Sequence, residues 1–212
     1  MKFTQQDIAN LDRNKRIVLI NAVAGIRPAN LIGSVSRSGL SNVAIFNSVM
    51  HLGSDPALLG FIMRPVETVA RHTYENILET EKYTINQVHT AIIKKAHYTS
   101  AKVDRGTSEF TACGLTETYI KNFKAPFVKE SRLKIGLQFI EALKIKQNNT
   151  LLIIGEIVYL EMPDTAFDDE DDLNLATLSS VGVSGLNTYY EVKKLARFPY
   201  ARPNELPDFT KH

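Results

Sequence analysis

The sequence predicts a mainly β protein, an antiparallel barrel or sandwich with short helical insertions. Short apolar and β-branched runs recur along its 212 residues and are separated by turn residues. No strand–helix alternation is long enough for a doubly wound sheet, and no internal repeat occurs. We expect roughly six to eight strands in a single domain. Its core would span about residues 15–165, and residues 166–212 would form a C-terminal extension.

The first third of the chain is predicted to be strands with one clear hairpin. Residues 16–21 are apolar and β-branched, which favours a first strand. Residues 31–36 and 43–50 flank a turn, Arg37-Ser38-Gly39, whose glycine is suited to a positive φ. A third strand is expected over residues 57–63. Together these runs form one antiparallel unit.

The rest of the chain mixes strands and short helices. A helix is expected after Thr73, with this threonine as its N-cap and acidic residues in its first turns. Strands are expected over 83–88 and 150–161, and a helix over 90–102. Residues 108–118 are predicted as a strand or a broken loop. Residues 133–146 show an alternation that drifts towards helical spacing. The acidic stretch 168–172 is interpreted as a solvated helix start, and the end of the chain, 181–212, as ordered but irregular.

Composition narrows the classes of partner. The net charge is +2, from 25 basic and 23 acidic residues, so we expect neither nucleic-acid nor membrane binding. The N-terminus is polar, and no run reaches the ~20 apolar residues of a membrane helix. Cys113 is the single cysteine, which points to a reducing compartment. The five histidines lack metal-site spacing. We therefore expect a cytoplasmic protein without a metal site.

The most informative segment surrounds the predicted helix start at Arg71, His72 and Thr73. A helix N-terminus offers free N–H groups and partial positive charge. Arg71 adds a charge-assisted donor, Thr73 adds a hydroxyl, and Arg64 closes the preceding strand. This combination suits a phosphate monoester. An ordinary capped helix with solvated arginines fits the same residues.

A second feature is the hairpin strand around Ala44. Small or polar side chains replace large aliphatic ones at Asn42, Ala44, Asn47 and Ser48. Such positions allow a flat heteroaromatic ring to approach the backbone amides. A strand with one face in solvent would show the same composition.

Five segments in chain order resemble the flavin reductase-like family, whose fold is the FMN-binding split barrel. They cover about residues 15–118. They are Asn30-Leu-Ile-Gly-Ser-Val-Ser36, Ser38-Gly-Leu-Ser-Asn-Val-Ala-Ile-Phe-Asn-Ser48, Asp55-Pro-Ala-Leu-Leu-Gly-Phe61, Arg71-His-Thr-Tyr-Glu-Asn-Ile77 and Tyr83-Thr-Ile-Asn86. Near the end of the chain, residues 185–190 and 197–200 resemble a longer bacterial subgroup described as flavoprotein oxygenase or flavoredoxin-like.

The resemblance implies a set of cofactor-binding residues. Arg64, Arg71, His72 and Thr73 would surround the FMN phosphate. The isoalloxazine ring and ribityl chain would be lined by Ser34, Asn42, Ala44, Asn47 and Ser48. It also implies a homodimer with the flavin near the subunit interface. One position departs from the family pattern, because Glu109 stands where a lysine is usual.

The function implied is an NAD(P)H-dependent flavin reductase or oxidoreductase that uses bound FMN for hydride transfer. Electrons would pass to a small molecule or to another protein, and no catalytic residue is demanded of the chain. Two alternatives remain open: an FMN electron carrier without a nicotinamide site, and a flavin-storage or interaction protein. Aromatic residues of the tail, among them Phe198 and Tyr200, would either cover the ring or form a shelf for nicotinamide.

Overall fold

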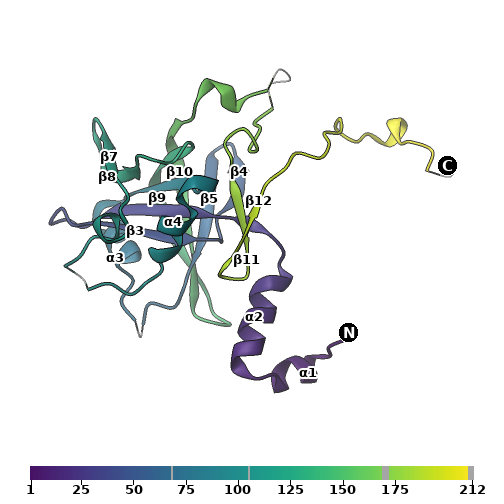
Figure 1. The fold of residues 1–212 in the computed structure, drawn as a ribbon, viewed down its shortest axis with the longest axis horizontal. Coiled ribbons are helices and arrows are strands. Elements are labelled where there is room, and N and C mark those ends of the chain that lie inside the picture. The colour runs from purple at the N-terminus through teal and green to yellow at the C-terminus, as the bar shows by residue number, and fades with distance from the viewer. Residues whose placement is uncertain (68, 105, 169–171, 210–212) are drawn as a thin grey trace.

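The computed structural model describes residues 1–67, 69–104, 106–168 and 172–209, and it confirms the mainly β fold (Figure 1). One seven-stranded sheet has the order β3-β2-β6-β9-β10-β5-β4, and each of its pairings is antiparallel. Its strands are β2 (Asn30–Val35), β3 (Ser41–Phe46), β4 (Met50–Ser54), β5 (Ala57–Met63), β6 (Lys82–Gln87), β9 (Lys134–Ile145) and β10 (Thr150–Glu161).

The sheet rolls into a split barrel because of its connectivity. β3 and β4 lie at opposite edges of the sheet, yet only residues 47–49 separate them in the chain. Three residues span roughly 10–13 Å at most, so the two edges must come together. Ser48 fastens this closure, because its hydroxyl accepts from the N–H of Ile62 at 3.1 Å and donates to the Ile62 carbonyl at 3.3 Å.

The other elements pack around this barrel. A three-stranded sheet joins β1 (Arg27–Pro28), β11 (Val181–Ser184) and β12 (Thr188–Glu191), and a hairpin joins β7 (Glu117–Ile120) to β8 (Phe123–Val128). The helices are α1 (Gln5–Asn10), α2 (Arg13–Val23), α3 (His72–Thr80), α4 (Ile93–Tyr98) and α5 (Glu109–Cys113), with short 3-10 turns at Thr90–Ile92, Asp164–Ala166 and Pro203–Glu205.

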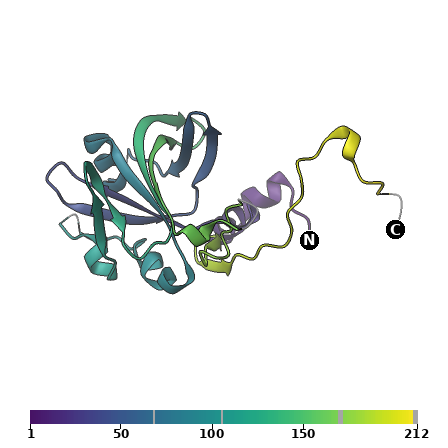
Figure 2. The same ribbon diagram turned by 90° about the horizontal axis from the view of Figure 1, so that it is seen from above.

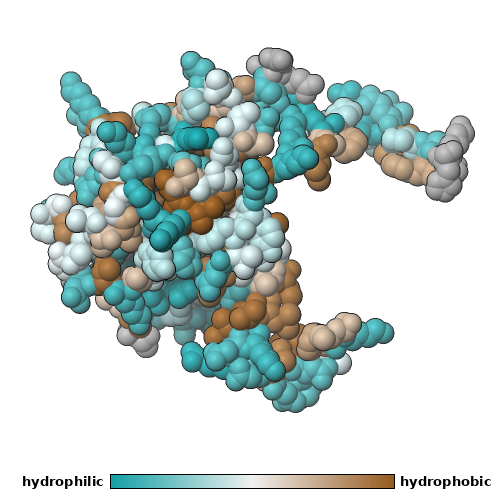
Figure 3. Space-filling view, viewed as in Figure 1, coloured by the Kyte–Doolittle hydropathy of each residue, from teal (hydrophilic) through white to brown (hydrophobic). Residues whose placement is uncertain are grey.

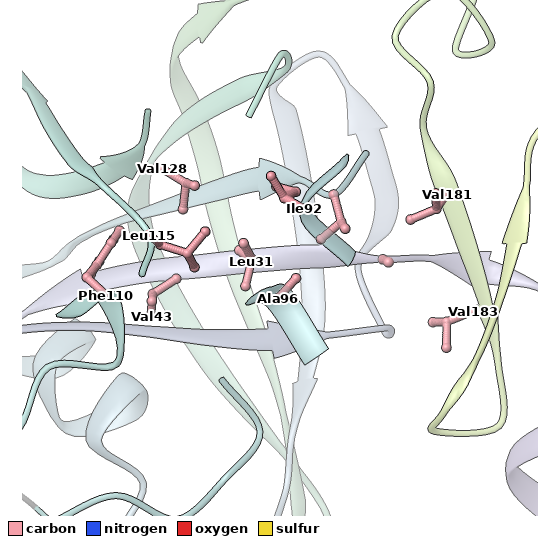
Figure 4. Close-up of a cluster of buried hydrophobic side chains, with 11 residues drawn as sticks. Leu31, Val43, Ile92, Ala96, Phe110, Leu115, Val128, Val181 and Val183 are labelled. Carbon is pink, nitrogen blue, oxygen red and sulfur yellow. The ribbon is translucent and has the colours of Figure 1, made fainter. Parts of the chain in front are cut away.

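Strand β2 separates two hydrophobic cores. Leu31 points into a cluster that includes Val43, Phe110 and Val181 and lies under α4 and α5 (Figure 4). Ile32 points the opposite way, into the barrel interior. Successive side chains of a strand face opposite sides, so a strand buried on both faces shows no polar alternation. All six residues of β2 are buried, including the polar Asn30 and Ser34.

A buried polar network ties β6 to its neighbours. The Asn86 amide donates to the Leu31 carbonyl and accepts from the N–H of Val128, at 3.1 and 3.0 Å. Thr84 donates to the carbonyl of Pro126 at 2.6 Å. Here β8 passes so close to β2 that a Cβ on Gly33 would lie 2.2 Å from the same carbonyl oxygen. The Asn86 segment of the family pattern is therefore structural.

The predicted first strand over residues 16–21 is wrong, because these residues lie in α2. Asp12 is the N-cap, and its carboxylate accepts from the N–H groups of Asn14 and Lys15 at 2.9 and 3.2 Å. A short apolar run does not by itself distinguish a strand from a helix. The capping aspartate was the signal that favoured the helix.

The helical spacing towards which residues 133–146 drift does not reflect a helix, because β9 is a strand throughout. Its register with β10 skips Ile140, since Glu141 pairs with Ile154 and Phe139 pairs with Gly155. This β-bulge reverses the alternation of faces along the strand. In the sequence, that reversal imitates a helical period.

Several boundaries also differ from the sequence prediction. The strand predicted over 43–50 is divided between β3 and the start of β4, and the open segment 108–118 contains α5 and the start of β7. The expected irregular C-terminus includes the β11–β12 hairpin, which turns at Gly185 with φ +64°. Residues 169–171 of the proposed helix start lie outside the described residues. Among the described residues, no helix is both long and apolar enough to cross a membrane.

The two ends of the chain project from the barrel as arms (Figures 1 and 2). The N-terminal arm is residues 1–26, with α1 and α2, which lie wholly within the described residues and contain no buried residue. The C-terminal arm is residues 192–209. Phe198 and Tyr200 remain 84% and 86% exposed there. The C-terminal arm therefore covers no surface of its own chain with these rings.

Candidate functional site

The start of α3 presents backbone donors to an anion. The N–H groups of Tyr74 and Glu75 both donate to the Arg71 carbonyl, at 2.8 and 3.0 Å. The N–H groups of His72 and Thr73 therefore lie outside the helical ladder. Arg71 is the N-cap residue and makes no side-chain cap. The predicted N-cap role of Thr73 is thus wrong, and this threonine belongs to the first turn.

Two arginines stand beside this helix start. Arg64 directly follows β5, and Arg71 is half-buried, donating from Nε to the Pro65 carbonyl at 3.4 Å. Burial and, second, the positive charge of Arg64 hold the pKa of Arg71 below its usual value. Two cations that repel each other are both stabilised by a bound anion. The pair therefore favours a phosphate or a similar group at the start of α3.

Thr73 connects the helix start to the edge strand β3. One orientation of the Asn42 amide satisfies all of its neighbours: its oxygen accepts from the Thr73 hydroxyl at 3.0 Å and from the Val43 N–H at 3.2 Å. Its nitrogen then donates to a carboxylate oxygen of Glu109 at 3.2 Å. Asn42 and Thr73 are both buried. This network fixes the position of α3 against β3.

The backbone of β3 offers hydrogen bonds along its free edge. β3 pairs only with β2 in the seven-stranded sheet, and the N–H of Val43 is directed at Glu109 and not at β2. In an antiparallel pair, alternate residues direct both backbone groups to the same side. The N–H and C=O of Ile45 therefore face the same edge, beside the small side chain of Ala44.

A pocket of about 260 Å³ adjoins the helix start. The β2–β3 turn, α3 and the beginning of α5 surround it. Asn42 and His72 belong both to this pocket and to the predicted binding set, and Asn76 and Glu109 line it as well. Two of the nine predicted residues, Asn42 and His72, thus border this polar pocket.

The predicted residues divide into two groups. Arg71, His72, Thr73 and Asn42 gather at the start of α3, with Arg64 close to Arg71. The remaining side chains lie farther along β2 and β3. Ser34 is fully buried and accepts from the Asn76 amide at 3.1 Å.

Asn47 and Ser48 are used by the fold itself. Asn47 donates to the carbonyl of Gly185 at 2.9 Å, which attaches the β11–β12 hairpin to the end of β3. Ser48 closes the barrel through Ile62. Ala44 lies between these residues and the helix start. Any contact of Asn47 or Ser48 with a ligand would come in addition to these bonds.

Two residues near the site were not among the predicted binding residues, although Asn76 lies in the Arg71–Ile77 segment of the family pattern. Glu109 comes from α5 and is 7% exposed, and Asn76 comes from the second turn of α3. Both lie more than 30 positions from Asn42, so only the tertiary fold brings them to it. The unusual acid at position 109 was visible in the sequence as a departure from the family pattern, but its burial was not.

A model of the flavin reductase like domain matches residues 26–181. The chain belongs to the flavin reductase-like family. The matched segment begins at the end of the N-terminal arm and includes α3, β3 and α5, which together form the site.

Two solved structures share the fold over nearly the whole chain. A proposed flavin reductase with split barrel domain from Shewanella frigidimarina NCIMB 400 is 45% identical, with a TM-score of 0.90, and the match covers 95% of this chain and 100% of the other. The flavoredoxin of Desulfovibrio vulgaris (Miyazaki F) is 20% identical, with a TM-score of 0.75 and coverage of 95% and 98%. An uncharacterized protein of Aquifex aeolicus is 24% identical over 165 residues, 77% of this chain and 83% of the other.

Proposed function

We propose that this chain binds FMN and uses it as an NAD(P)H-dependent flavin reductase or oxidoreductase. The observation that carries the proposal is the pair Arg64 and Arg71 beside a helix start whose first N–H groups lie outside the helical ladder. The free edge of β3 adjoins this cationic point through the Asn42–Thr73 contact. A molecule with a phosphate at one end and a flat polar ring at the other fits that arrangement.

The phosphate end fits the residues at α3. A phosphate monoester carries up to two negative charges and three strong acceptor oxygens. His72 and Thr73 supply backbone N–H groups, and Arg71 supplies a guanidinium that forms charge-assisted bonds. Release of the repulsion between Arg64 and Arg71 adds to the affinity.

The ring end fits the edge of β3. The carbonyl groups and ring nitrogens of an isoalloxazine match the N–H and C=O of Ile45 on that edge. Ala44 is small enough to permit close approach of a flat ring. When bound, FMN supplies a ring that accepts a hydride from NADH or NADPH and passes the electrons onward. The chain binds and orients the ring, and we assign no residue to proton transfer in that step.

The experiment that tests the proposal is anaerobic reduction of the FMN-loaded protein by NADH and by NADPH. Loss of the visible flavin absorbance is expected with at least one of them. The electron acceptor, a small molecule or a protein, is then found by adding candidates to the reduced form. Purified protein that ignores added FMN would contradict the proposal.

A carrier without a nicotinamide site is the second candidate, favoured by the structural similarity to a flavoredoxin. A carrier would bind FMN and keep its colour under NAD(P)H, yet would bleach with dithionite or a partner reductase. The same anaerobic experiment therefore separates the enzyme from the carrier.

We also propose a homodimer, in which the arms of one chain pack on the other. Helices as short as α1 and α2 are marginal in water without tertiary packing. Figure 3 shows hydrophobic surface along the N-terminal arm and at points on the C-terminal arm, with an open hollow between them. The three exposed rings Phe198, Tyr200 and Phe209 alone present on the order of 500 Å², against about 800 Å² per partner in a standard interface.

A cytoplasmic location remains our prediction.

A further inference from the structure

A buried carboxylate lies next to the point where the proposed phosphate would bind. Glu109 is the first residue of α5 and is 7% exposed. Within the part of the chain that the structure describes, no lysine or arginine forms an ion pair with it. A buried ionised carboxylate without a counter-ion is unfavourable. Its position therefore calls for an explanation beyond packing.

The contacts of Glu109 lead directly to the helix start. Its carboxylate faces the N–H of Val43 and accepts from the Asn42 amide at 3.2 Å, and Asn42 in turn accepts from the Thr73 hydroxyl at 3.0 Å. Two hydrogen bonds thus separate the acid from the first turn of α3. A dianion at that turn and an ionised Glu109 would repel each other through a buried, weakly screened region.

Burial raises the pKa of Glu109, and the backbone N–H groups of Glu109 and Val43 and the nearby charge of His72 oppose that rise. Other titratable and charged groups face Glu109 or its pocket. They are Arg37 from the β2–β3 turn, His72, Glu75 and Glu79 from α3, Cys113 from α5, Lys95 from α4, which donates to the carbonyl of Gly114, and Glu117, which reaches the pocket edge through Ser41.

We propose that Glu109 takes up one proton from solvent when a phosphomonoester binds at the start of α3, and so couples flavin phosphate binding to pH. This inference rests on the proposed binding of FMN. A neutral carboxylic acid still accepts from the Asn42 amide through its carbonyl oxygen. Its charge is lost. Glu109 is thus a positioning residue that holds Asn42 in either state and becomes compatible with a dianion when protonated.

The coupling has a definite sign. A bound anion raises the pKa of Glu109 further. The affinity for FMN is then highest below the pKa of the free protein, falls as pH rises towards the pKa of the complex, and is constant above it. Ionisation of the FMN phosphate near pH 6 acts in the opposite direction.

The test is a fluorescence titration with FMN over a series of pH values, on the wild-type chain and on Glu109→Gln. We expect the wild-type affinity to fall, by at most about tenfold per pH unit, as pH rises from the pKa of Glu109 in the free protein to its higher pKa in the complex. In Glu109→Gln the fall should be much smaller, with affinity at high pH exceeding that of the wild type. Riboflavin, which lacks the phosphate, should show no such difference between the two proteins.

The matched control is Glu79→Gln, a carboxylate that lines the same pocket but is exposed. It should keep the pH dependence of the wild type. If Glu109→Gln keeps it too, the proposal is overturned while FMN binding stands. A wild-type chain that binds no FMN would overturn the proposed function as well.

A second measurement covers the case in which Glu109→Gln does not fold. Calorimetric titration of FMN into His72→Gln in buffers of different ionisation enthalpy counts the protons taken up on binding. Net uptake without His72 supports the role of Glu109. No uptake at any pH overturns it.

Discussion

At the scale of single residues, the electrostatics of the site depend on two cations and one acid. Burial and, second, the nearby charge of Arg64 lower the pKa of Arg71. Glu109 lies on the opposite side of the Asn42–Thr73 contact. An anion between these groups is attracted from one side and repelled from the other. The proposed phosphate would therefore be held by Arg64 and Arg71, and Glu109 would take up a proton when it binds.

Replacement of Arg71 by alanine tests the cationic side. Loss of a charge-assisted phosphate contact should weaken FMN binding by roughly 1.5–3 kcal/mol, which is about 10- to 150-fold. The melting temperature should change little, because the side chain makes only a long bond to the Pro65 carbonyl. Fluorescence titration gives the affinity and thermal unfolding gives the stability. Arg13→Ala, in the N-terminal arm, is the control and should bind FMN as the wild type does. Unchanged affinity in Arg71→Ala would place the phosphate elsewhere.

Much of this residue-level arrangement could be predicted from the sequence, since Arg64, Arg71, His72 and Thr73 are close together in the chain. The partner of Thr73 could not. Thr73 was predicted as the N-cap, but its hydroxyl bonds to Asn42 across the fold. Such a tertiary contact leaves no local pattern. The burial of Glu109 was invisible for the same reason.

At the scale of elements, close contacts between strands position the site. Strand β8 crosses β2 at Gly33, where an added Cβ would meet the Pro126 carbonyl oxygen at 2.2 Å and the Thr84 hydroxyl at 2.5 Å. Backbone on one side and a bonded hydroxyl on the other leave little freedom to move. The glycine in this part of the family pattern is therefore required by packing.

We expect Gly33→Ala to destabilise the fold by about 2–3 kcal/mol or to prevent folding, because an overpacked core must shift backbone. Denaturant unfolding measures the change. Gly106→Ala is the matched control, since a Cβ at Gly106 meets no atom within 4 Å, and it should have nearly the stability of the wild type. Equal stability of the two variants would contradict the close crossing of β2 and β8.

The β9–β10 pair carries an ion pair between Lys134 and Glu161 that should make stability depend on pH. The hydrogen bond from Lys134 holds the pKa of Glu161 below its ordinary value. The stabilisation from this ion pair is complete above the ordinary pKa of a glutamate and is lost as pH falls through the lowered pKa of Glu161. Glu161 is partly exposed, so we expect Glu161→Gln to cost about 0.5–1 kcal/mol at pH 7 and nearly nothing at pH 3. Thermal unfolding at both pH values checks this, with the exposed Glu141→Gln as control; a cost that persists at pH 3 would contradict it.

Elements were predictable where the local pattern was undisturbed. The strands β2, β5 and β10 match their apolar runs closely. The pattern failed in β9, where the bulge at Ile140 reverses the faces, and in α2, whose apolar run had been interpreted as strand. In both cases the outcome depended on pairing or capping and not on composition.

At the scale of the whole molecule, the two arms of a monomer expose apolar side chains to water. Val18 and Val23 of α2 are each 68% exposed, and Phe198 and Tyr200 are exposed further still. Large apolar surfaces of this kind mark contact sites in proteins. The proposed homodimer would cover both arms at once, because a two-fold axis would let the arms of each chain pack on the other.

Light scattering after size-exclusion chromatography should therefore give twice the chain mass of 23.7 kDa for the wild type. Combined Val18→Glu and Val23→Glu replacements place charges on the proposed interface and should shift the equilibrium to monomer. Lys15→Glu, an exposed charge change in the same helix, should leave the dimer intact. A monomeric wild type would rule out the homodimer.

The proposed function requires the start of α3 to hold the phosphate of a flavin whose ring lies along β3. A direct test compares the affinity of the wild-type chain for FMN with that for riboflavin, which differs only in the phosphate. Two or more charge-assisted contacts predict that FMN binds at least about tenfold more tightly at neutral pH. Equal affinities for the two flavins would contradict the claim.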